Sequence, residues 1–337
     1  MAHELDFSTG EAAIAYAANT PVPWHGFGKT LLPTDTVDEQ AEKAGLAWSV
    51  LKADVQFTPK KLSFDDAGKY DMHDTDIASM PGQSVLYRSD TLAPLSVMST
   101  KRYNIVQPRD ALEFFDKLAH TSDLKLDVAG ALKGGKKVWA IARVNETANI
   151  IGRDAVRPFL LFHTSFDGSA ATTVRYVTER VVCANTLAIA MDEEIQGIKM
   201  RHSEKFDAVK VHEKLAKIHD AHARFVERAQ LLTSKGVSDK QLEELTVEIL
   251  TRGNEAKQLS SDIRETRSYK KIIAMFNGVG LIGGDVDGGK SAWRLLNTVT
   301  QLVDHERGKN RESGLDSAWF GEGSRIKQEA MELLVEL

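Results

Sequence analysis

The amino-acid sequence predicts an α+β fold, in which an antiparallel β-sheet packed with helices precedes a mostly helical region. Between residues 85 and 177, short runs of β-branched and aromatic residues are separated by turn signals, which is the pattern of strands. From Val211 onward, apolar residues recur at helical spacing instead. The change of pattern divides the 337 residues into a strand-rich part, 1–205, and a helical part, 206–337, which we expect to pack as one unit.

Six runs in the first part predict the strands of the sheet. They are Val85–Arg88, Leu95–Met98, Leu124–Val128, Val138–Val144, Phe159–Phe162 and Thr172–Val177. The pairs Gly134-Gly135 and Asp167-Gly168 lie between successive runs and predict hairpin turns, because glycine adopts positive φ without strain. Two helices are predicted among the strands, at about 36–44 and 108–119; the first has acidic residues in its first turn and the second has proline there.

A heptad pattern predicts one long helix after residue 210. Residues at alternating spacings of four and three form its seam: Val211, Leu215, Ile218, His222, Phe225, Ala229 and Leu232. Such a narrow seam packs against another helix of the same chain or of a neighbouring subunit, and Gly236 should end the helix. Further helices are predicted at about 238–250, 260–276, 291–305 and 325–337.

The composition is that of a folded protein and limits how it can bind anions. Hydrophobic residues make up 42% of the chain, and the formal net charge is −5, so the chain is not disordered and has no basic excess over its whole surface. Any anion-binding surface must therefore be local. The chain has one cysteine, Cys183, no visible signal peptide and no apolar run of about 18 residues, so we expect a cytoplasmic protein with no membrane partner.

Basic residues gather at predicted hairpins and strand ends. They are Lys133, Lys136 and Lys137 at one hairpin, Arg175 and Arg180 on one run, and Lys199, Arg201 and Lys205 on the next. With Tyr103 and Tyr176 as stacking rings, they would suit a groove for single-stranded nucleic acid, where cations follow the phosphates and rings stack on bases. The alternative is a solvated sheet face with the aromatic rings in the core.

A glycine-rich segment matches a phosphate-binding motif. Gly284–Ser291 reads G-x-x-x-x-G-K-S, in which Lys290 and Ser291 would hold a nucleotide. A P-loop follows a strand, however, and residues 268–276 have the pattern of a helix. Asp285 and Asp287 would also repel a triphosphate. The context favours a helix–helix connection, and no cofactor is expected; a nucleotide-binding enzyme using Lys290 and Ser291 remains the alternative.

No catalytic or metal-binding residue is predicted. His212, His219 and His222 form the tightest histidine group, but His222 falls on the heptad seam and no carboxylate set accompanies them. Cys183 lies among apolar residues and has the character of a small core residue.

Four segments resemble blocks of a phage- and plasmid-encoded family, domain of unknown function 932. They are Pro23–Gly28, Tyr103–Pro108, Arg180–Leu187 and Trp293–His305. The resemblance implies a mobile genetic element in a bacterial host cell, but no settled activity. That setting and a helix-decorated antiparallel sheet suggest a distant fold similarity to single-strand annealing recombinases.

We therefore expect a non-enzymatic protein that binds and anneals single-stranded DNA in recombination or replication. An acidic subunit can do this as a homo-oligomer, if a ring or filament aligns its basic stripes into one channel. An exonuclease or replication protein would be a fitting partner. A host-interaction (anti-defence) protein that binds its partner through the helical part is a further alternative.

Overall fold

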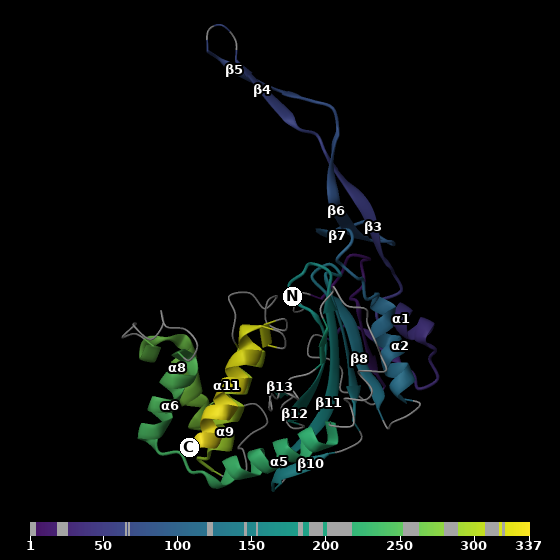
Figure 1. The fold of residues 1–337 in the computed structure, drawn as a ribbon. Coiled ribbons are helices and arrows are strands. Elements are labelled where there is room, and N and C mark those ends of the chain that lie inside the picture. The colour runs from purple at the N-terminus through teal and green to yellow at the C-terminus, as the bar shows by residue number, and fades with distance from the viewer. Residues whose placement is uncertain are drawn as a thin grey trace.

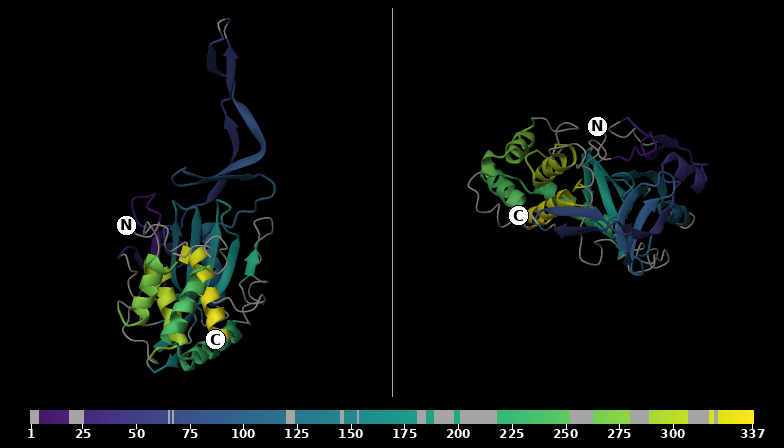
Figure 2. Two further views of the ribbon diagram at one scale, coloured as in Figure 1. Left: turned by 90° about the vertical axis from the view of Figure 1, so that its left-hand side faces the viewer. Right: turned by 90° about the horizontal axis from the view of Figure 1, so that it is seen from above.

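The computed structural model confirms the predicted α+β class and shows a body from which a long β arm projects (Figure 1). It describes residues 5–18, 26–64, 66, 68–119, 124–144, 147–152, 154–180, 185–188, 198–200, 218–251, 263–279, 289–306, 317–318 and 321–337. Figure 2 shows the arm leaving the body at one end of the sheet, away from the C-terminal helices.

A mixed sheet, antiparallel apart from the β1–β2 pair, forms the centre of the body. In the described residues its order is β13-β12-β11-β9-β8-β1-β2, with β10 paired to β11 and β14 paired to β12. Its strands are β1 (Ile14–Ala17), β2 (Lys29–Leu31), β8 (Lys125–Leu132), β9 (Lys137–Arg143), β10 (Ala148–Ile151), β11 (Asp154–Ser165), β12 (Thr172–Arg180), β13 (Asn185–Ala188) and β14 (Ile198–Met200). Four of the six predicted runs lie in β8, β9, β11 and β12.

The other two predicted runs belong to a second sheet, so the expectation of one sheet is corrected. This sheet has the order β3-β6-β7, formed by β3 (Val50–Phe57), β6 (Ala78–Arg88) and β7 (Pro94–Ser99). The distal part of the arm continues as a two-stranded ribbon of β4 (Lys60–Phe64) and β5 (Tyr70–Asp74).

Side-chain alternation gives the central sheet two buried faces. On one face, Leu160 and Phe162 pack in a cluster with residues of α2 (Pro108–Ala119) and α1 (Val37–Lys43). On the other face, Phe159 and Leu161 pack against the C-terminal helices. Period-two alternation places neighbouring residues on opposite faces, and both faces are apolar because helices cover both (Figure 1). Residues of both sequence parts meet in the second of these clusters.

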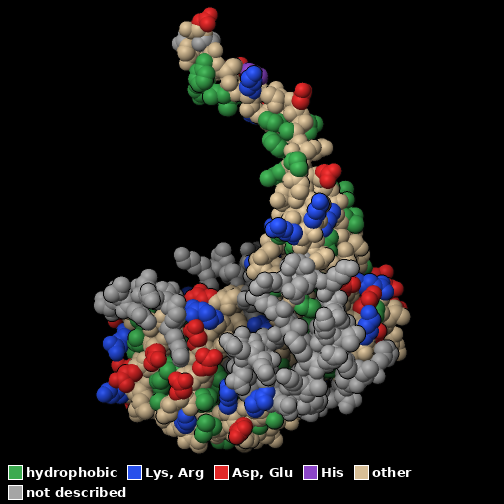
Figure 3. Space-filling view, in the orientation of Figure 1, with side chains coloured by type: hydrophobic (Ala, Val, Ile, Leu, Met, Phe, Trp, Pro, Cys, Tyr) green, Lys and Arg blue, Asp and Glu red, His purple; other side chains and the backbone are tan. Residues whose placement is uncertain are grey.

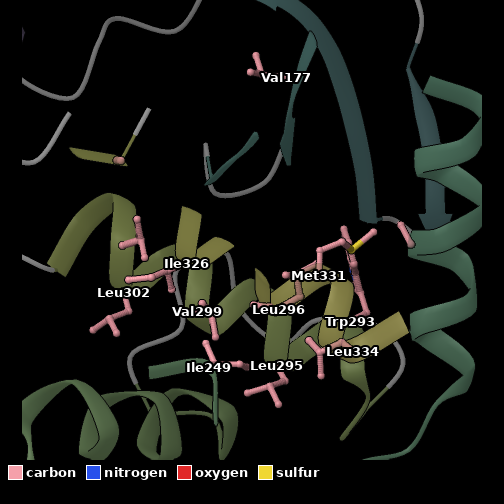
Figure 4. Close-up of a cluster of buried hydrophobic side chains, with 14 of the residues drawn as sticks. Val177, Ile249, Trp293, Leu295, Leu296, Val299, Leu302, Ile326, Met331 and Leu334 are labelled. Carbon is pink, nitrogen blue, oxygen red and sulfur yellow. The ribbon is translucent and has the colours of Figure 1, made fainter. Parts of the chain in front are cut away.

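The C-terminal helices lie close to their predicted positions. They are α5 (Ile218–Ser234), α6 (Asp239–Thr251), η1 (Ile263–Glu265), α8 (Arg267–Phe276), α9 (Ala292–Gln301), the π-helical turn η2 (Leu302–Glu306) and α11 (Glu322–Glu336). All residues of α9 are buried, and Figure 4 shows Trp293, Leu295 and Val299 of α9 among side chains of α11 and α6.

The heptad seam packs inside the subunit. His222, Phe225, Ala229 and Leu232 are all buried, and α5 contacts α9, α11 and β10. Of the two partners that the pattern left open, the described part of the seam therefore uses helices of its own chain. Its predicted beginning, 211–217, lies outside the described residues.

Candidate nucleic-acid interface

Both predicted stacking rings lie in the core. Tyr103 is 8% exposed and its hydroxyl donates a hydrogen bond of 2.6 Å to the carbonyl of Ser165; burial raises the pKa of this phenol, with a smaller contribution from the charge of Asp167. Tyr176 is 3% exposed, and its hydroxyl lies 2.5 Å from Nδ1 of His222. Neither ring has an exposed face on which a base could stack, so Tyr103 and Tyr176 do not belong to the candidate interface.

Two of the predicted cations are interior as well. Lys137 is 7% exposed on β9, because its position at the start of the strand directs it into the body. Arg175, a residue of β12, is half-buried, and its guanidinium meets α11, with Nη1 3.4 Å from Oγ of Ser324. Burial lowers the pKa of Arg175 to about 10. A buried lysine and a guanidinium that faces α11 are not placed to follow a phosphate chain, so neither residue belongs to a surface groove.

The remaining strand cations are only partly described. In the strand register, Arg180 at the end of β12 lies opposite Val156 of β11 and Asn185 of β13. Lys199 of β14 lies opposite Thr173 of β12. The side chains of Arg180 and Lys199 are not described. Arg201 and Lys205 lie outside the described residues. Their predicted role stays a prediction.

Lys133 and Lys136 stand where the hairpin prediction placed them. They lie in the β8–β9 turn, both half-buried, and Lys133 takes a positive φ of 55° there. Gly135 at the centre of the turn has no room for a Cβ atom, which would meet Nη1 of Arg88 at 2.8 Å and the ring of Trp48 at 3.0 Å. The turn is thus held tightly against the base of the arm.

Three exposed cations that were not in the predicted set surround the base of the arm: Lys52, Lys101 and Arg102. The ammonium of Lys52 donates to the carbonyls of Thr100 and Tyr103, at 3.1 and 2.7 Å, which brings β3 beside the loop of Lys101 and Arg102. No described carboxylate forms an ion pair with any of the three.

The loop after β11 joins these cations to the β8–β9 turn. The amide of Phe166 donates to the carbonyl of Lys136 at 2.8 Å, the carbonyl of Phe166 accepts from the hydroxyl of Ser96, and Ser165 accepts from Tyr103. We name Lys52, Lys101, Arg102, Lys133 and Lys136 the arm-base cluster. Figure 3 shows lysine and arginine side chains gathered at the base of the arm.

A buried charge network fixes the arm to the body. Arg88 is 1% exposed, forms ion pairs with Asp6 and Asp90, and lies 4.3 Å above the ring of Trp48. Desolvation by burial lowers the pKa of Arg88, but hydrogen bonds and charge attraction from Asp90 and Asp6 outweigh it, so that the pKa is raised. Arg88 therefore stays charged and serves as an anchor rather than as a phosphate contact.

The described neighbours of the glycine-rich segment are those of a helix connection. Helix α8 precedes it, as the sequence indicates, where a P-loop needs a strand. Lys290 is 2.7 Å from a carboxylate oxygen of Asp239, and Ser291 caps α9 by accepting a hydrogen bond from the amide of Arg294. Residues 280–288 lie outside the described ones.

We expect Ser291→Ala to lower the free energy of unfolding by about 1 kcal/mol, because it removes the side-chain acceptor at the start of a buried helix. Urea denaturation followed by circular dichroism measures this. Lys290→Ala, at the neighbouring exposed position, is the control and should change the value by less than about 0.5 kcal/mol. An unchanged stability for Ser291→Ala would contradict the capping role.

A buried ion pair was missed in the sequence. Lys327 of α11 is 1% exposed, and its Nζ lies 2.6 Å from Oδ1 of Asp304 in η2. Burial lowers the pKa of Lys327 more than the attraction of Asp304 raises it, and the charge of Arg175 lowers it further. No periodicity singled out Lys327, because a lone lysine on an amphipathic helix is normally solvated.

The histidine and cysteine predictions are only partly open to test. His222 is buried and bonded to Tyr176, as a packed seam residue. Cys183 and His212 lie outside the described residues, and the side chain of His219 is not described. Within the described part of the chain, no group of three or more potential ligands is arranged to hold a metal ion.

A family model described as "Domain of unknown function (DUF932)" matches residues 94–326. The chain belongs to the DUF932 family. No curated protein and no solved structure matches it. The DUF932 match includes four members of the arm-base cluster but begins after the arm strands β3 to β6. Of the helices that the structure describes, none combines the length and the apolar character needed to cross a bilayer.

Proposed function

We propose that this DUF932 protein binds single-stranded DNA, without enzymatic activity of its own, and acts in annealing, recombination or replication on a phage or plasmid. The observation that supports the proposal is the arm-base cluster, in which five cations from three segments of the chain lie at the base of the arm. Three of them are exposed and carry no ion pair among the described residues. Such cations contact phosphates and release counterions on binding.

The composition constrains the arrangement. Because the chain carries a net charge of −5, a single subunit offers only a short basic surface to DNA. A homo-oligomer, as a ring or filament, would repeat the arm-base cluster along one strand and raise the number of phosphates contacted. With Tyr103 and Tyr176 in the core, affinity would come mainly from phosphates and would depend little on base sequence.

We expect Lys101→Glu/Arg102→Glu to weaken binding of a labelled single-stranded oligonucleotide about tenfold or more at low salt. Two lost phosphate contacts should also reduce the slope of log K against log salt by about 1.4, at about 0.7 per phosphate. Fluorescence anisotropy across a salt series gives both values.

The control is Lys240→Glu/Lys270→Glu, which changes the net charge equally at two exposed lysines of α6 and α8. It should leave the affinity within about threefold of the unmodified protein, since surface charges beyond the Debye length are screened. Loss of binding by the control as large as that of the cluster variant would show that only net charge matters. Absence of any binding by the unmodified protein at low salt would remove the proposal.

A further inference from the structure

The distal ribbon of the arm has one apolar face. In the β4–β5 pairing, Leu62 lies opposite Met72, Phe64 opposite Tyr70, and Lys60 opposite Asp74. Because side chains alternate along a strand, these six share one face, and the residues between them share the other. The other face carries Lys61, Ser63, Asp71 and His73.

Nothing in the described structure covers this apolar face. Its four apolar side chains are all exposed: Leu62 49%, Phe64 67%, Tyr70 63% and Met72 58%. Figure 3 shows hydrophobic side chains along the distal arm, far from the body. A lone two-stranded ribbon is marginally stable in water, and contiguous apolar surface of this kind marks an interaction site.

Charge restricts the occupant. Between residues 60 and 76 the chain carries three lysines and five aspartates, so the ribbon is acidic. An acidic ribbon repels phosphates of nucleic acid and of anionic lipid surfaces. The apolar face itself carries one lysine and one aspartate, Lys60 and Asp74, so it is neutral and does not repel a second copy of the same face. The arm is therefore suited to a protein surface, in contrast to the basic cluster at its base.

The ribbon face is complementary to a second copy of itself. Two ribbons can stack with their apolar faces in contact, related by a two-fold axis that runs parallel to the strands between the two faces. This axis places β4 of one copy over β5 of the other and keeps the register. Leu62 then meets Met72 of the second copy, Phe64 meets Tyr70, and Lys60 meets Asp74. Isologous contacts of this type put each residue pair at the interface twice. Lys60 and Asp74 already pair within each ribbon, with 3.9 Å between Nζ and Oδ1, and the stack adds to each of them the opposite charge of the second copy.

We propose that two copies of this chain associate face to face through β4 and β5, with Lys60 of each copy paired to Asp74 of the other. At the observed exposures the eight apolar side chains supply roughly 100 Å² each, or about 800 Å² in all. This is below the 1,200–2,000 Å² of standard stable interfaces, so the pair is a weak, reversible dimer. The proposal does not depend on DNA binding.

Sedimentation velocity of the full chain without DNA, across roughly 1–100 µM, should show a reversible monomer–dimer equilibrium. Leu62→Lys places a charge in the middle of the apolar face and should raise the dissociation constant more than about thirtyfold. Ser63→Lys introduces the same charged side chain at the next residue, on the opposite face, and should leave the constant within about threefold. A monomeric unmodified protein, or equal effects of the two variants, would overturn the proposal.

A mixing experiment tests the geometry. In Lys60→Asp two aspartates face each other across the axis, and in Asp74→Lys two lysines do, so each variant alone should be monomeric. When the two variants are mixed, each contact between positions 60 and 74 across the interface again joins opposite charges. Within each ribbon, positions 60 and 74 still carry the same charge and repel each other. Heterodimer formation on mixing, with affinity within about tenfold of the unmodified dimer, supports the two-fold stack. No recovery on mixing would overturn it, because an antiparallel stack or a different partner does not bring position 60 to position 74.

Discussion

Asp304→Asn should lower the free energy of unfolding by about 3 kcal/mol at neutral pH. The substitution keeps the size of the side chain but removes the charge that lies 2.6 Å from the ammonium of Lys327, which is 1% exposed. Removing one partner of a buried ion pair leaves the other charge without compensation in a poorly polarisable interior. Urea denaturation, with the slope compared between variants, measures the change.

The loss in free energy of unfolding caused by Asp304→Asn should become smaller as the pH rises. The pKa of Lys327 is lowered from 10.5 in the folded protein, chiefly by desolvation. Between the folded and unfolded pKa values the unfolded chain binds more protons, so stability increases with pH in that window. Without the charge of Asp304, the pKa of Lys327 in the folded protein falls further, so the pH range in which stability increases begins at a lower pH. The difference between variant and unmodified protein should therefore be smaller at about pH 9.5 than at about pH 7.

A double variant provides the control. Asp304→Asn/Lys327→Met replaces the buried charge by an apolar chain of similar length and should recover most of the lost stability, since apolar replacements of buried pairs are often neutral. A single variant within about 0.5 kcal/mol of the unmodified protein, as at surface sites, would contradict the burial of the pair. A deficit that grows with pH would contradict the lowered pKa.

The elements predicted best from the sequence are those buried on both faces. Strands β9 and β11 are covered by helices on either side, so their central residues, Val138–Ala142 and Phe159–Phe162, are all apolar. The arm strands were missed for the opposite reason. Residues 60–64 and 70–74 contain no β-branched residue and face solvent on both sides, so neither composition nor alternation of burial marks them as strands.

The candidate site was harder to predict because its residues are far apart in the sequence and come together only through long-range contacts. Lys52 joins Lys101 and Arg102 through hydrogen bonds that span about fifty residues of sequence. Lys136 and Lys137 are adjacent in sequence, yet one is half-buried and the other buried, because the strand begins between them. Tyr103 and Tyr176 are buried against residues far away in the sequence, Ser165 and His222 respectively. A local sequence pattern does not predict such contacts.

Trp293→Ala should lower the free energy of unfolding by roughly 3–5 kcal/mol. Trp293 is fully buried, meets the ring of Phe225 edge-on at 6.4 Å, and donates a hydrogen bond of 2.7 Å from Nε1 to Oδ2 of Asp154. Trp293→Phe keeps most of the ring but removes the donor to the carboxylate of Asp154, and should lose about 1.5–3 kcal/mol. Circular dichroism in urea separates the two.

The contact between Trp293 and Asp154 belongs to a buried core that joins the two parts of the chain. Asp154 begins β11 in the central sheet and Trp293 lies in α9, so the hydrogen bond joins the strand-rich part to the helical part. Residues of both parts belong to one buried cluster, which includes Phe159 and Leu161 with Phe225 and Leu296. A shared core makes the free energy of each part depend on the other. The unmodified protein and Trp293→Phe should therefore each unfold in one transition, with coincident midpoints in far-ultraviolet circular dichroism and in tyrosine-sensitive near-ultraviolet signals. Two separated transitions, with helix lost before the sheet, would show that the two parts hold together only weakly.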